Sequence, residues 1–403
     1  MYTSHQALTD FIRQAIQQTG PVTFEWFMEQ ALYHPELGYY SSGRCGIGRG
    51  GDYFTNVSVG PLFGRLLAAQ FAEMWESMGR PDDFVIVEQG AHHGDFARDV
   101  LGAVRERAPD FFSTLRYWII EPFPILRERQ GKALHDFSEK LTWEESLIDL
   151  EPFCGVHFSN ELLDAMPVHL IDKVARASSL NRVGSSGKNR RSLYDSDAEW
   201  QERFVVESGD EFSFVTASIT DAELRLHLNT IPGHLSGPYE TEVNLAALKW
   251  IESLAQKLIR GYVLAVDYGY SRGDYYAPER TSGTLQCYAH HRVIRSPLTD
   301  IGNVDITAHI DWTSVASWGE KHGLTVAGFT DQHHFVTGVV TALMQEEFDA
   351  EADAGTRRAL QTLLHPEFLG KTFQFLALTR NIAPGFPLSG FRFARDSRAA
   401  LGV

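Results

Sequence analysis

Short apolar segments alternate with amphipathic segments along most of the chain. The segments 84–88, 117–121 and 262–267 are apolar runs that each end in an acidic residue. Helical spacing of apolar residues predicts a helix over residues 60–78 and another after Asn244. Buried strands that alternate with helices are typical of a parallel sheet covered on both faces, so this pattern predicts an α/β fold.

Two other regions have different patterns. Near the N-terminus, helical spacing places one apolar face on Leu8, Phe11, Ile12, Ala15 and Ile16. The segment 176–201 is rich in Ser, Arg and Asn without periodicity, which is typical of an exposed excursion, and alternation over 212–215 indicates strands beside it. We therefore predict an N-terminal helical region with a lid loop (1–78), the first half of an α/β core (79–172), a β-rich insertion (173–243), the second half of the core (244–381) and a tail (382–403).

Composition narrows the class of protein. The 403 residues include 36 Lys and Arg against 52 Asp and Glu, which gives a formal charge of −16. This acidic balance argues against a nucleic-acid surface, and no apolar run is long enough to predict membrane insertion. The N-terminal sequence lacks both the pattern of a signal peptide and the Arg-rich bias of a transit peptide. Because three widely separated cysteines indicate reduced thiols, we expect a cytoplasmic protein.

The first candidate for a binding site is the turn from Glu88 to Gly94, between the strand 84–88 and a helix that starts near Asp95. A glycine-rich turn at this place lets the backbone approach a ligand at the carboxyl edge of the sheet. His92 stands near the middle glycine position of a G-x-G-x-x-G loop, which disfavours NAD because a pyrophosphate needs bare backbone there. A ligand without phosphates, such as S-adenosylmethionine, needs less of it. An ordinary strand-to-helix turn is the alternative.

Glu121 is a second candidate at the same edge of the sheet. It ends the strand that follows the glycine turn, where an acidic residue in such sheets can bind both ribose hydroxyls of a nucleoside. A solvated carboxylate at the end of a strand is the alternative. Together with the turn at Gly90, Glu121 favours a ligand that carries a ribose.

Several ordered blocks of the chain resemble the MidA family of S-adenosylmethionine-dependent methyltransferases. The blocks are GRGGDYFTNVSVGPLFG (48–64), VEQGAHHGDFARDVL (87–101), WIIEPFPILRERQ (118–130), SNELLDAMPV (159–168), GYVLAVDYGY (261–270), GTLQCYAHH (283–291) and GNVDITAHIDW (302–312). The family includes a mitochondrial complex I assembly factor that methylates a protein arginine. The chain departs from the family pattern at Asn56, Val57, Ala91 and His92.

The resemblance implies a Rossmann-like class I methyltransferase sheet, with an N-terminal helical region over the site and a β-rich insertion. It implies S-adenosyl-L-methionine as the cofactor and a protein as the substrate, with a respiratory-complex subunit as one candidate. A loop between Gly50 and Gly60, which we predict to be a mobile lid, would close over the cofactor. The residues that the resemblance assigns to the cofactor are Glu88, Gly90 and Gly94 in the turn, Glu121 at the ribose, and Thr55 and Asp52 on the loop.

Methyl transfer to an arginine also needs carboxylates that orient the guanidinium and stabilise its charge. Asn160 and Glu161 follow the strand 154–159 and, by the resemblance, face the reacting methyl group. Glu161 and Asp164 share one face if the segment 160–164 is helical, so we predict Glu161, Asp164 and Asn160 as the catalytic residues. Acidic residues that cap the start of a helix are the alternative.

Asp267, which ends the strand 262–267, is a further candidate for this acidic pocket. Asp305 and His309 could complete it, although a turn carboxylate and a packed histidine are the favoured interpretation of these two. The fourth strand is not followed by N-P-P-Y or D-P-P-Y, a run that would grip a planar amide or an exocyclic amine. Methylation of glutamine or adenine is therefore disfavoured.

Two classes of function remain open. The first is a methyltransferase that acts on a protein side chain, with an arginine nitrogen as the target. The second is a non-catalytic binding or assembly protein that retains the fold, for which Ala91 and His92 are the grounds. The adjacent pairs His92–His93, His290–His291 and His333–His334 lack the i, i+4 spacing of a helical zinc site, so no metal is predicted. The sequence carries no indication of oligomeric state.

Overall fold

A mixed sheet of eight strands forms the centre of the computed structural model, which describes residues 4–43, 55–175, 198–235, 237–289, 292–344, 353–383 and 387–403. The strand order is β15-β16-β10-β5-β2-β3-β4, and the short strand β14 (Ile310–Asp311) pairs with the end of β10. The other strands of this sheet are β2 (Phe84–Gln89), β3 (Leu115–Ile120), β4 (Leu141–Glu144), β5 (Phe153–Asn160), β10 (Leu258–Tyr270), β15 (Thr325–Asp331) and β16 (Phe373–Arg380).

The strands predicted from the apolar runs are confirmed, but the sheet is not wholly parallel. Neighbours from β10 through β5, β2 and β3 to β4 pair in parallel, with Val85 opposite Gly155 and Ile86 opposite Tyr117. In contrast, β16 runs antiparallel between β10 and β15. An apolar run indicates burial on both faces and carries no information on strand direction, so this pattern could not reveal the antiparallel strand.

Helices cover both faces of the sheet, and alternate residues of each strand face the two layers. In β2, Ile86 packs in a cluster with α3 (Leu62–Ser77), α4 (Asp95–Arg107), α11 (Gln332–Leu343) and α13 (Ala354–Leu364). Val85 and Val87 pack in another cluster, with α8 (Leu245–Lys257) and α10 (Trp312–Lys321). The helices predicted over 60–78 and after Asn244 are confirmed. The side chain of Asn244 caps α8 by accepting the N–H of Ala247 at 2.8 Å.

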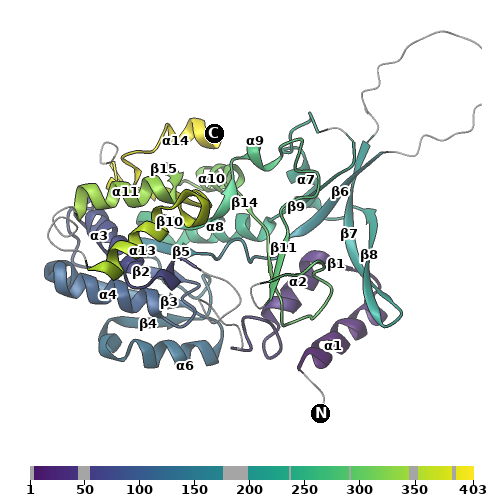
Figure 1. Cartoon of the computed structure of the whole chain (residues 1–403), viewed down its shortest axis with the longest axis horizontal. Coiled ribbons are helices and arrows are strands. Elements are labelled where there is room, and N and C mark those ends of the chain that lie inside the picture. Colours follow the sequence, from purple (N-terminus) through teal and green to yellow (C-terminus); the bar gives the residue numbers. More distant parts are fainter. Residues whose placement is uncertain are drawn as a thin grey trace, which may run out of the picture.

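The N-terminal helices lie beside the central sheet in a second part of the molecule (Figure 1). The predicted N-terminal helix is confirmed as α1 (Ser4–Thr19), which buries Leu8, Ile12 and Ile16, whereas Phe11 is 39% exposed. α2 (Phe24–Tyr33) packs with α1 on two small sheets. One consists of β1 (Val22–Thr23), β6 (His169–Ala175), β7 (Ala198–Ser208), β8 (Glu211–Ser218) and β9 (Tyr239–Val243), and the other of β11 (Gln286–Ala289), β12 (Arg292–Val293) and β13 (Asp305–Thr307).

The C-terminal residues pack on the core, a feature that the sequence did not indicate. α14 (Ser397–Leu401) lies against β15 and buries Leu401. The backbone N–H of Ser389 donates to Glu73 and that of Gly390 to Gln70, each at 2.9 Å. These contacts hold the segment against α3.

The boundaries at residues 78, 172, 243 and 381 remain predictions. The remaining helices are α5 (Pro109–Thr114), α6 (Pro124–Ala133), α7 (Ala222–Leu228) and α9 (Arg272–Tyr275).

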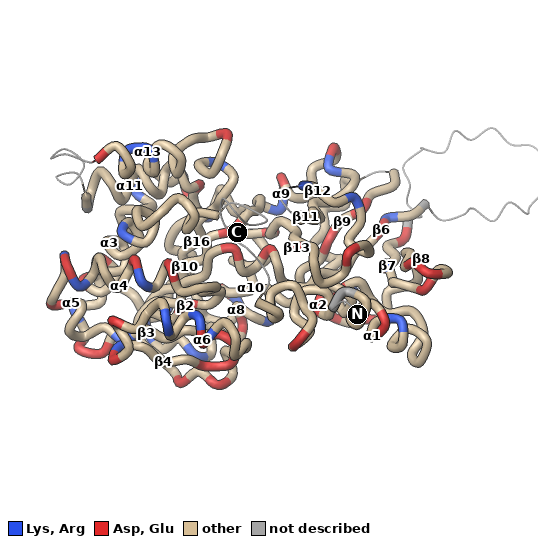
Figure 2. Tube along the Cα trace, turned by 60° about the horizontal axis from the view of Figure 1, so that its bottom comes forward, with Lys and Arg blue, Asp and Glu red and all other residues tan. Residues whose placement is uncertain are grey.

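Charged residues are distributed over both parts of the molecule. Lys and Arg are interspersed with Asp and Glu along the trace (Figure 2). None of the helices in the described ranges combines the length and the apolar character that crossing a membrane requires.

Candidate active site

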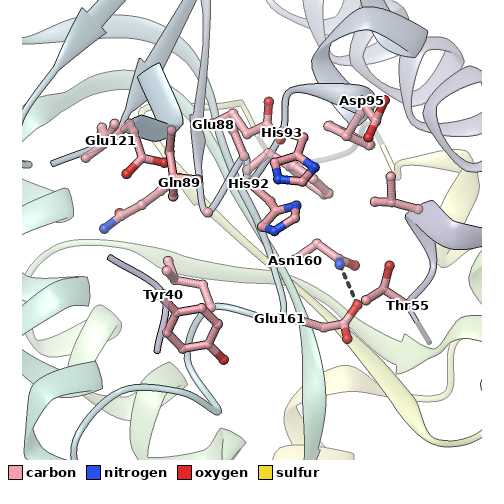
Figure 3. A pocket seen from close by; sticks show the side chains of 18 of the residues that line it. Tyr40, Thr55, Glu88, Gln89, His92, His93, Asp95, Glu121, Asn160 and Glu161 are labelled. Atoms are coloured by element: carbon pink, nitrogen blue, oxygen red, sulfur yellow. Dashed lines mark hydrogen bonds between the residues drawn. The ribbon is translucent and has the colours of Figure 1, made fainter. Parts of the chain in front are cut away.

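A cavity of about 500 Å³ lies at the carboxyl ends of β2, β3 and β5 (Figure 3). The sheet adds β3 and β4 on one side of β2 and β5 on the other, so this edge is the topological switch point, where open α/β sheets bind ligands. Tyr33 of α2 and Tyr40 line the cavity from the second part of the molecule. The remaining lining residues lie mainly in the segments 55–61, 88–99, 120–126 and 158–165.

The predicted glycine turn forms the edge of this cavity next to β2. Gly90 has a φ of 86° and Gly94 a φ of 84°, values that favour glycine. His92, near the position where a glycine was expected, has a φ of 45°, which histidine adopts more readily than most residues. Gln130 holds this conformation by donating to the carbonyl oxygen of His92 at 2.9 Å. The turn thus keeps a left-handed backbone without its middle glycine.

The structure separates the two glycines of the turn. Gly90 lines the cavity, and a Cβ added there would meet the side chain of Leu162 at 3.6 Å. Gly94 begins α4 and is not among the lining residues. A Cβ at Gly94 would lie 3.2 Å from Leu134, so this glycine permits close packing of α4. The structure therefore does not bring Gly94, which was predicted to bind the cofactor, to the cavity.

Glu88, at the end of β2, lines the cavity and is buried. The hydroxyl of Tyr117 on β3 donates to its Oε2 at 2.6 Å. Burial raises the pKa of Glu88 to about 7, and the hydrogen bond from Tyr117 opposes this shift. The carboxyl group is therefore fixed in position beside the glycine turn.

Glu121 follows β3 and is 5% exposed, so it is not the solvated strand-end carboxylate that was the alternative. Its Oε1 accepts the N–H of Phe123 at 3.1 Å, and its Oε2 accepts Nε2 of Gln130 at 2.9 Å. Burial raises the pKa of Glu121 to about 7. Since Gln130 also holds His92, one side chain links the predicted ribose carboxylate to the turn.

Asn160 and Glu161, at the end of β5, both line the cavity (Figure 3). Nδ2 of Asn160 donates to Oε1 of Glu161 at 2.7 Å, and Nδ2 of Asn56 donates to Oδ1 of Asn160 at 3.1 Å. The backbone N–H of Asn56 also bonds to Glu161. Desolvation raises the pKa of Glu161 to about 8, and the nearby charge of Asp267 contributes to this rise. This contact of Asn56 could not be predicted, because Asn56 and Asn160 lie 104 positions apart in the chain.

The segment after Glu161 is a series of turns, so the prediction that Glu161 and Asp164 share a helix face is wrong. So is the alternative that they cap a helix. Oδ2 of Asp267 accepts the N–H groups of Leu162, Leu163 and Asp164 at 3.1, 2.8 and 3.2 Å, which folds the segment around one carboxylate. Asp164 is buried behind the cavity and does not line it. Burial and the charge of Asp267 raise its pKa well above its usual range.

Removing the charge of Asp267 should destabilise this turn. Burial raises the pKa of Asp267 to about 7, and the hydrogen bonds from the backbone N–H groups oppose this rise. In Asp267→Asn, an amide N–H would face backbone N–H groups, so we expect the free energy of unfolding to fall by about 1–3 kcal/mol. Denaturant unfolding measures this loss. Asp83→Asn, which breaks a surface ion pair with Arg116, is the matched control. Equal stability of the two variants would contradict the role of Asp267.

Asp305 and His309 have different surroundings in the structure. Asp305 is 3% exposed and accepts the hydroxyl of Tyr40 at 2.6 Å, so it lies behind the tyrosines of the cavity wall. His309 stacks on Tyr270 with ring centroids 5.2 Å apart, and burial lowers its pKa to about 4. His309 is thus a packed histidine, in line with the favoured interpretation.

The loop predicted as a lid is described only from residue 55 onward. Thr55 lines the cavity, and its Oγ1 lies 3.1 Å from Oγ of Ser58. Asp52 and the glycines before it lie outside the described residues, so their assignment to the cofactor and the motion of the lid remain predictions. Within the described part of the chain, no group of three or more His, Cys, Asp or Glu residues has the arrangement of a metal site.

Comparison with known proteins links this chain to methyl transfer. The model of a family described as S-adenosyl-L-methionine-dependent methyltransferases matches residues 66–330. A crystal structure of a COG1565 superfamily member from Burkholderia thailandensis, bound to S-adenosyl-homocysteine, is 29% identical with a TM-score of 0.81 and covers 96% of this chain and 95% of its own. A native structure of a protein of that superfamily from the same organism is 28% identical, with a TM-score of 0.80 and the same coverage. The predicted Rossmann-like fold is confirmed.

Two curated relatives are named as protein arginine methyltransferases. NDUFAF7 homolog of Drosophila melanogaster is 25% identical over 425 residues, which cover 96% of this chain and 89% of its own length. Human NDUFAF7 is 24% identical over 415 residues, which cover 95% of this chain and 85% of its own length. Both relatives are named as mitochondrial, so the prediction of a cytoplasmic protein is wrong.

Proposed function

Since the chain belongs to the MidA-like family of S-adenosyl-L-methionine-dependent methyltransferases, we propose that it methylates an arginine nitrogen of a protein substrate. The predicted family and cofactor are confirmed by the family match and by the S-adenosyl-homocysteine of the Burkholderia thailandensis relative. The names of the Drosophila and human relatives support arginine as the target. The observation in this chain that carries the proposal is the carboxyl group of Glu161, fixed on the wall of the cofactor cavity.

The cavity offers the groups that this cofactor needs. Gly90 and His92 keep the turn in a left-handed conformation that leaves the backbone accessible at the switch point. Glu121 is buried, oriented by Gln130, and of the right chemistry to accept two ribose hydroxyls. When bound, S-adenosyl-L-methionine supplies a methyl group activated by a positively charged sulfur. Thr55 borders the same cavity and would cover the cofactor.

Glu161 has two tasks in this proposal. Its carboxylate pairs with the guanidinium through N–H donors and holds the reacting nitrogen in place. The nitrogen that gains a methyl group loses one proton, so the methylated guanidinium again carries a single positive charge. Glu161 accepts that proton once its carboxyl is ionised, and its raised pKa makes it a stronger base than an ordinary carboxylate. Asn160, bonded to Oε1, fixes the orientation of the carboxylate.

The proposal predicts how activity depends on pH. Because the pKa of Glu161 is raised to about 8, the carboxyl is mostly protonated and neutral below that pH, and it attracts a cation poorly. With saturating cofactor, kcat/KM for the protein substrate should rise with pH and level off above about 8. The Glu161→Gln variant should lose this dependence. A profile that is flat for the parent between about pH 6.5 and 9, or a rise that persists in the variant, would contradict a titrating Glu161.

The target residue can be tested directly. Purified protein is incubated with methyl-labelled S-adenosyl-L-methionine and an extract of cells that lack its gene, and the labelled proteins are hydrolysed to amino acids. We expect the label in methylated arginine. Label in another amino acid would overturn the arginine proposal. Cofactor binding without any transfer would favour the alternative of a non-catalytic binding or assembly protein.

A further inference from the structure

Two tyrosines form a wall of the cavity that is separate from the methyltransferase sheet. Tyr33 ends α2, Tyr40 lies on the turn after it, and both line the cavity. Their rings are stacked, with centroids 5.5 Å apart and planes inclined by 27°. Tyr39 packs edge-on against Tyr40 with centroids 5.0 Å apart. Contacts with both neighbours hold the ring of Tyr40 in one orientation.

Hydrogen bonds fix the same rings at their hydroxyl ends. Tyr33 donates to the carbonyl oxygen of Ala165 at 3.0 Å. Tyr40 donates to Oδ1 of Asp305 at 2.6 Å, and Asp305 is 3% exposed on β13. A short bond between a hydroxyl and a buried carboxylate is strong, so Asp305 anchors Tyr40 from a strand far along the chain. Burial and the charges of Asp164, Asp305 and Asp267 raise the pKa of Tyr33, which keeps this ring neutral.

Tyr40 lies on the same side of the cavity as Glu161 in Figure 3, away from Glu88 and His93. A carboxylate such as Glu161 attracts a guanidinium and an ammonium alike. An aromatic ring distinguishes them, because the planar and weakly hydrated guanidinium stacks on a ring, whereas the compact ammonium keeps its water. The cavity therefore combines a charge that binds either cation with an aromatic surface that favours the guanidinium.

We propose that Tyr40, positioned by Asp305, selects the guanidinium of arginine over the ammonium of lysine. This inference rests on the proposed function, because it assigns the residue that makes Glu161 specific for one cation. In this role Tyr40 contacts the substrate, and Asp305 acts only through Tyr40. The role of Asp305 is therefore that of a positioning residue.

The inference is tested by titrating the full chain, saturated with S-adenosyl-homocysteine, with capped single amino acids. The probes are Nα-acetyl-arginine N-methylamide and Nα-acetyl-lysine N-methylamide, and NMR measures the binding of each. We expect the parent to bind the arginine probe more tightly. Tyr40→Leu should lower the affinity for the arginine probe at least tenfold, which is the scale of a desolvated cation–π contact. It should change the affinity for the lysine probe about twofold or less. Phe11→Leu, which alters an exposed aromatic residue outside the cavity, is the matched control.

A second pair of variants separates the ring of Tyr40 from its anchor. Tyr40→Phe keeps the ring and removes the hydroxyl, so it should retain most of the preference for arginine. Asp305→Asn should produce the same small loss of arginine preference, and the double variant should be no worse than either single one, because each change breaks the hydrogen bond between Tyr40 and Asp305. Additive losses would overturn the positioning role of Asp305.

The outcomes distinguish this inference from the function on which it rests. One contrary result is that Tyr40→Leu keeps the parent's affinity for the arginine probe, and another is that it lowers the affinity for both probes equally. In either case Tyr40 does not select the cation, and the inference fails while the proposed function stands. If the parent binds S-adenosyl-homocysteine but prefers the lysine probe, or binds neither probe, both the inference and the arginine proposal fail.

Discussion

Replacing Glu161 by glutamine is expected to lower turnover by roughly 10²-fold, the scale of losing one well-placed group that stabilises charge. Glutamine keeps the shape of the side chain and can still accept from Asn160, so the change isolates the negative charge. Because the pairing with the guanidinium matters most in the geometry of methyl transfer, the loss should appear in kcat more than in cofactor affinity. Initial rates on the identified substrate, at saturating cofactor, measure the effect.

Cofactor affinity is the internal control for this variant. Calorimetric titration with S-adenosyl-L-methionine should give a dissociation constant within a few-fold of the parent. Glu144→Gln, at the end of β4 on the edge of the same sheet and outside the cavity lining, is the matched control for losing a strand-end carboxylate. Full activity of Glu161→Gln would show that the carboxylate is structural.

Replacing Glu121 by alanine is expected to weaken cofactor binding at least tenfold. A buried carboxylate that accepts two ribose hydroxyls makes charge-assisted hydrogen bonds, each worth roughly 1.5–3 kcal/mol. The loss should appear as a higher dissociation constant for S-adenosyl-L-methionine. Glu121→Gln, which preserves the shape and can still accept a hydrogen bond, should weaken binding less.

The alanine variant also leaves Nε2 of Gln130 and the N–H of Phe123 without one acceptor, so its fold must be checked by denaturant unfolding. Glu144→Ala removes a carboxylate from the next strand and should bind the cofactor like the parent. An unchanged dissociation constant in folded Glu121→Ala would remove Glu121 from the ribose site.

Much of the site could be predicted because it depends on the ends of buried strands. The apolar runs locate β2, β3 and β10, the resemblance adds β5, and the carboxyl ends of parallel strands meet at one edge of a sheet. Glu88, Gly90, Glu121 and Glu161 each lie at or just after such an end, so the strand pattern together with the family resemblance predicted them at one site. The structure brings all four to one cavity.

The features that could not be predicted depend on contacts between distant segments. The spacing of Glu161 and Asp164 suits a helix, but the carboxylate of Asp267, from another strand, holds the intervening backbone in turns. Tyr33 lies at the end of α2 and is half-buried, and no local signal shows that it lines a cavity. The anchor of Tyr40 on Asp305 joins residues 265 positions apart, a pairing that periodicity cannot indicate.

A crystal structure of the chain with S-adenosyl-homocysteine bound would show directly whether cofactor and nucleophile meet in the cavity between the glycine turn and Glu161. We predict that the ligand occupies this cavity, with both ribose hydroxyls within hydrogen-bonding distance of Glu121 and the sulfur facing Glu161 and Tyr40. A ligand bound elsewhere, or one whose sulfur faces away from Glu161, would contradict the account.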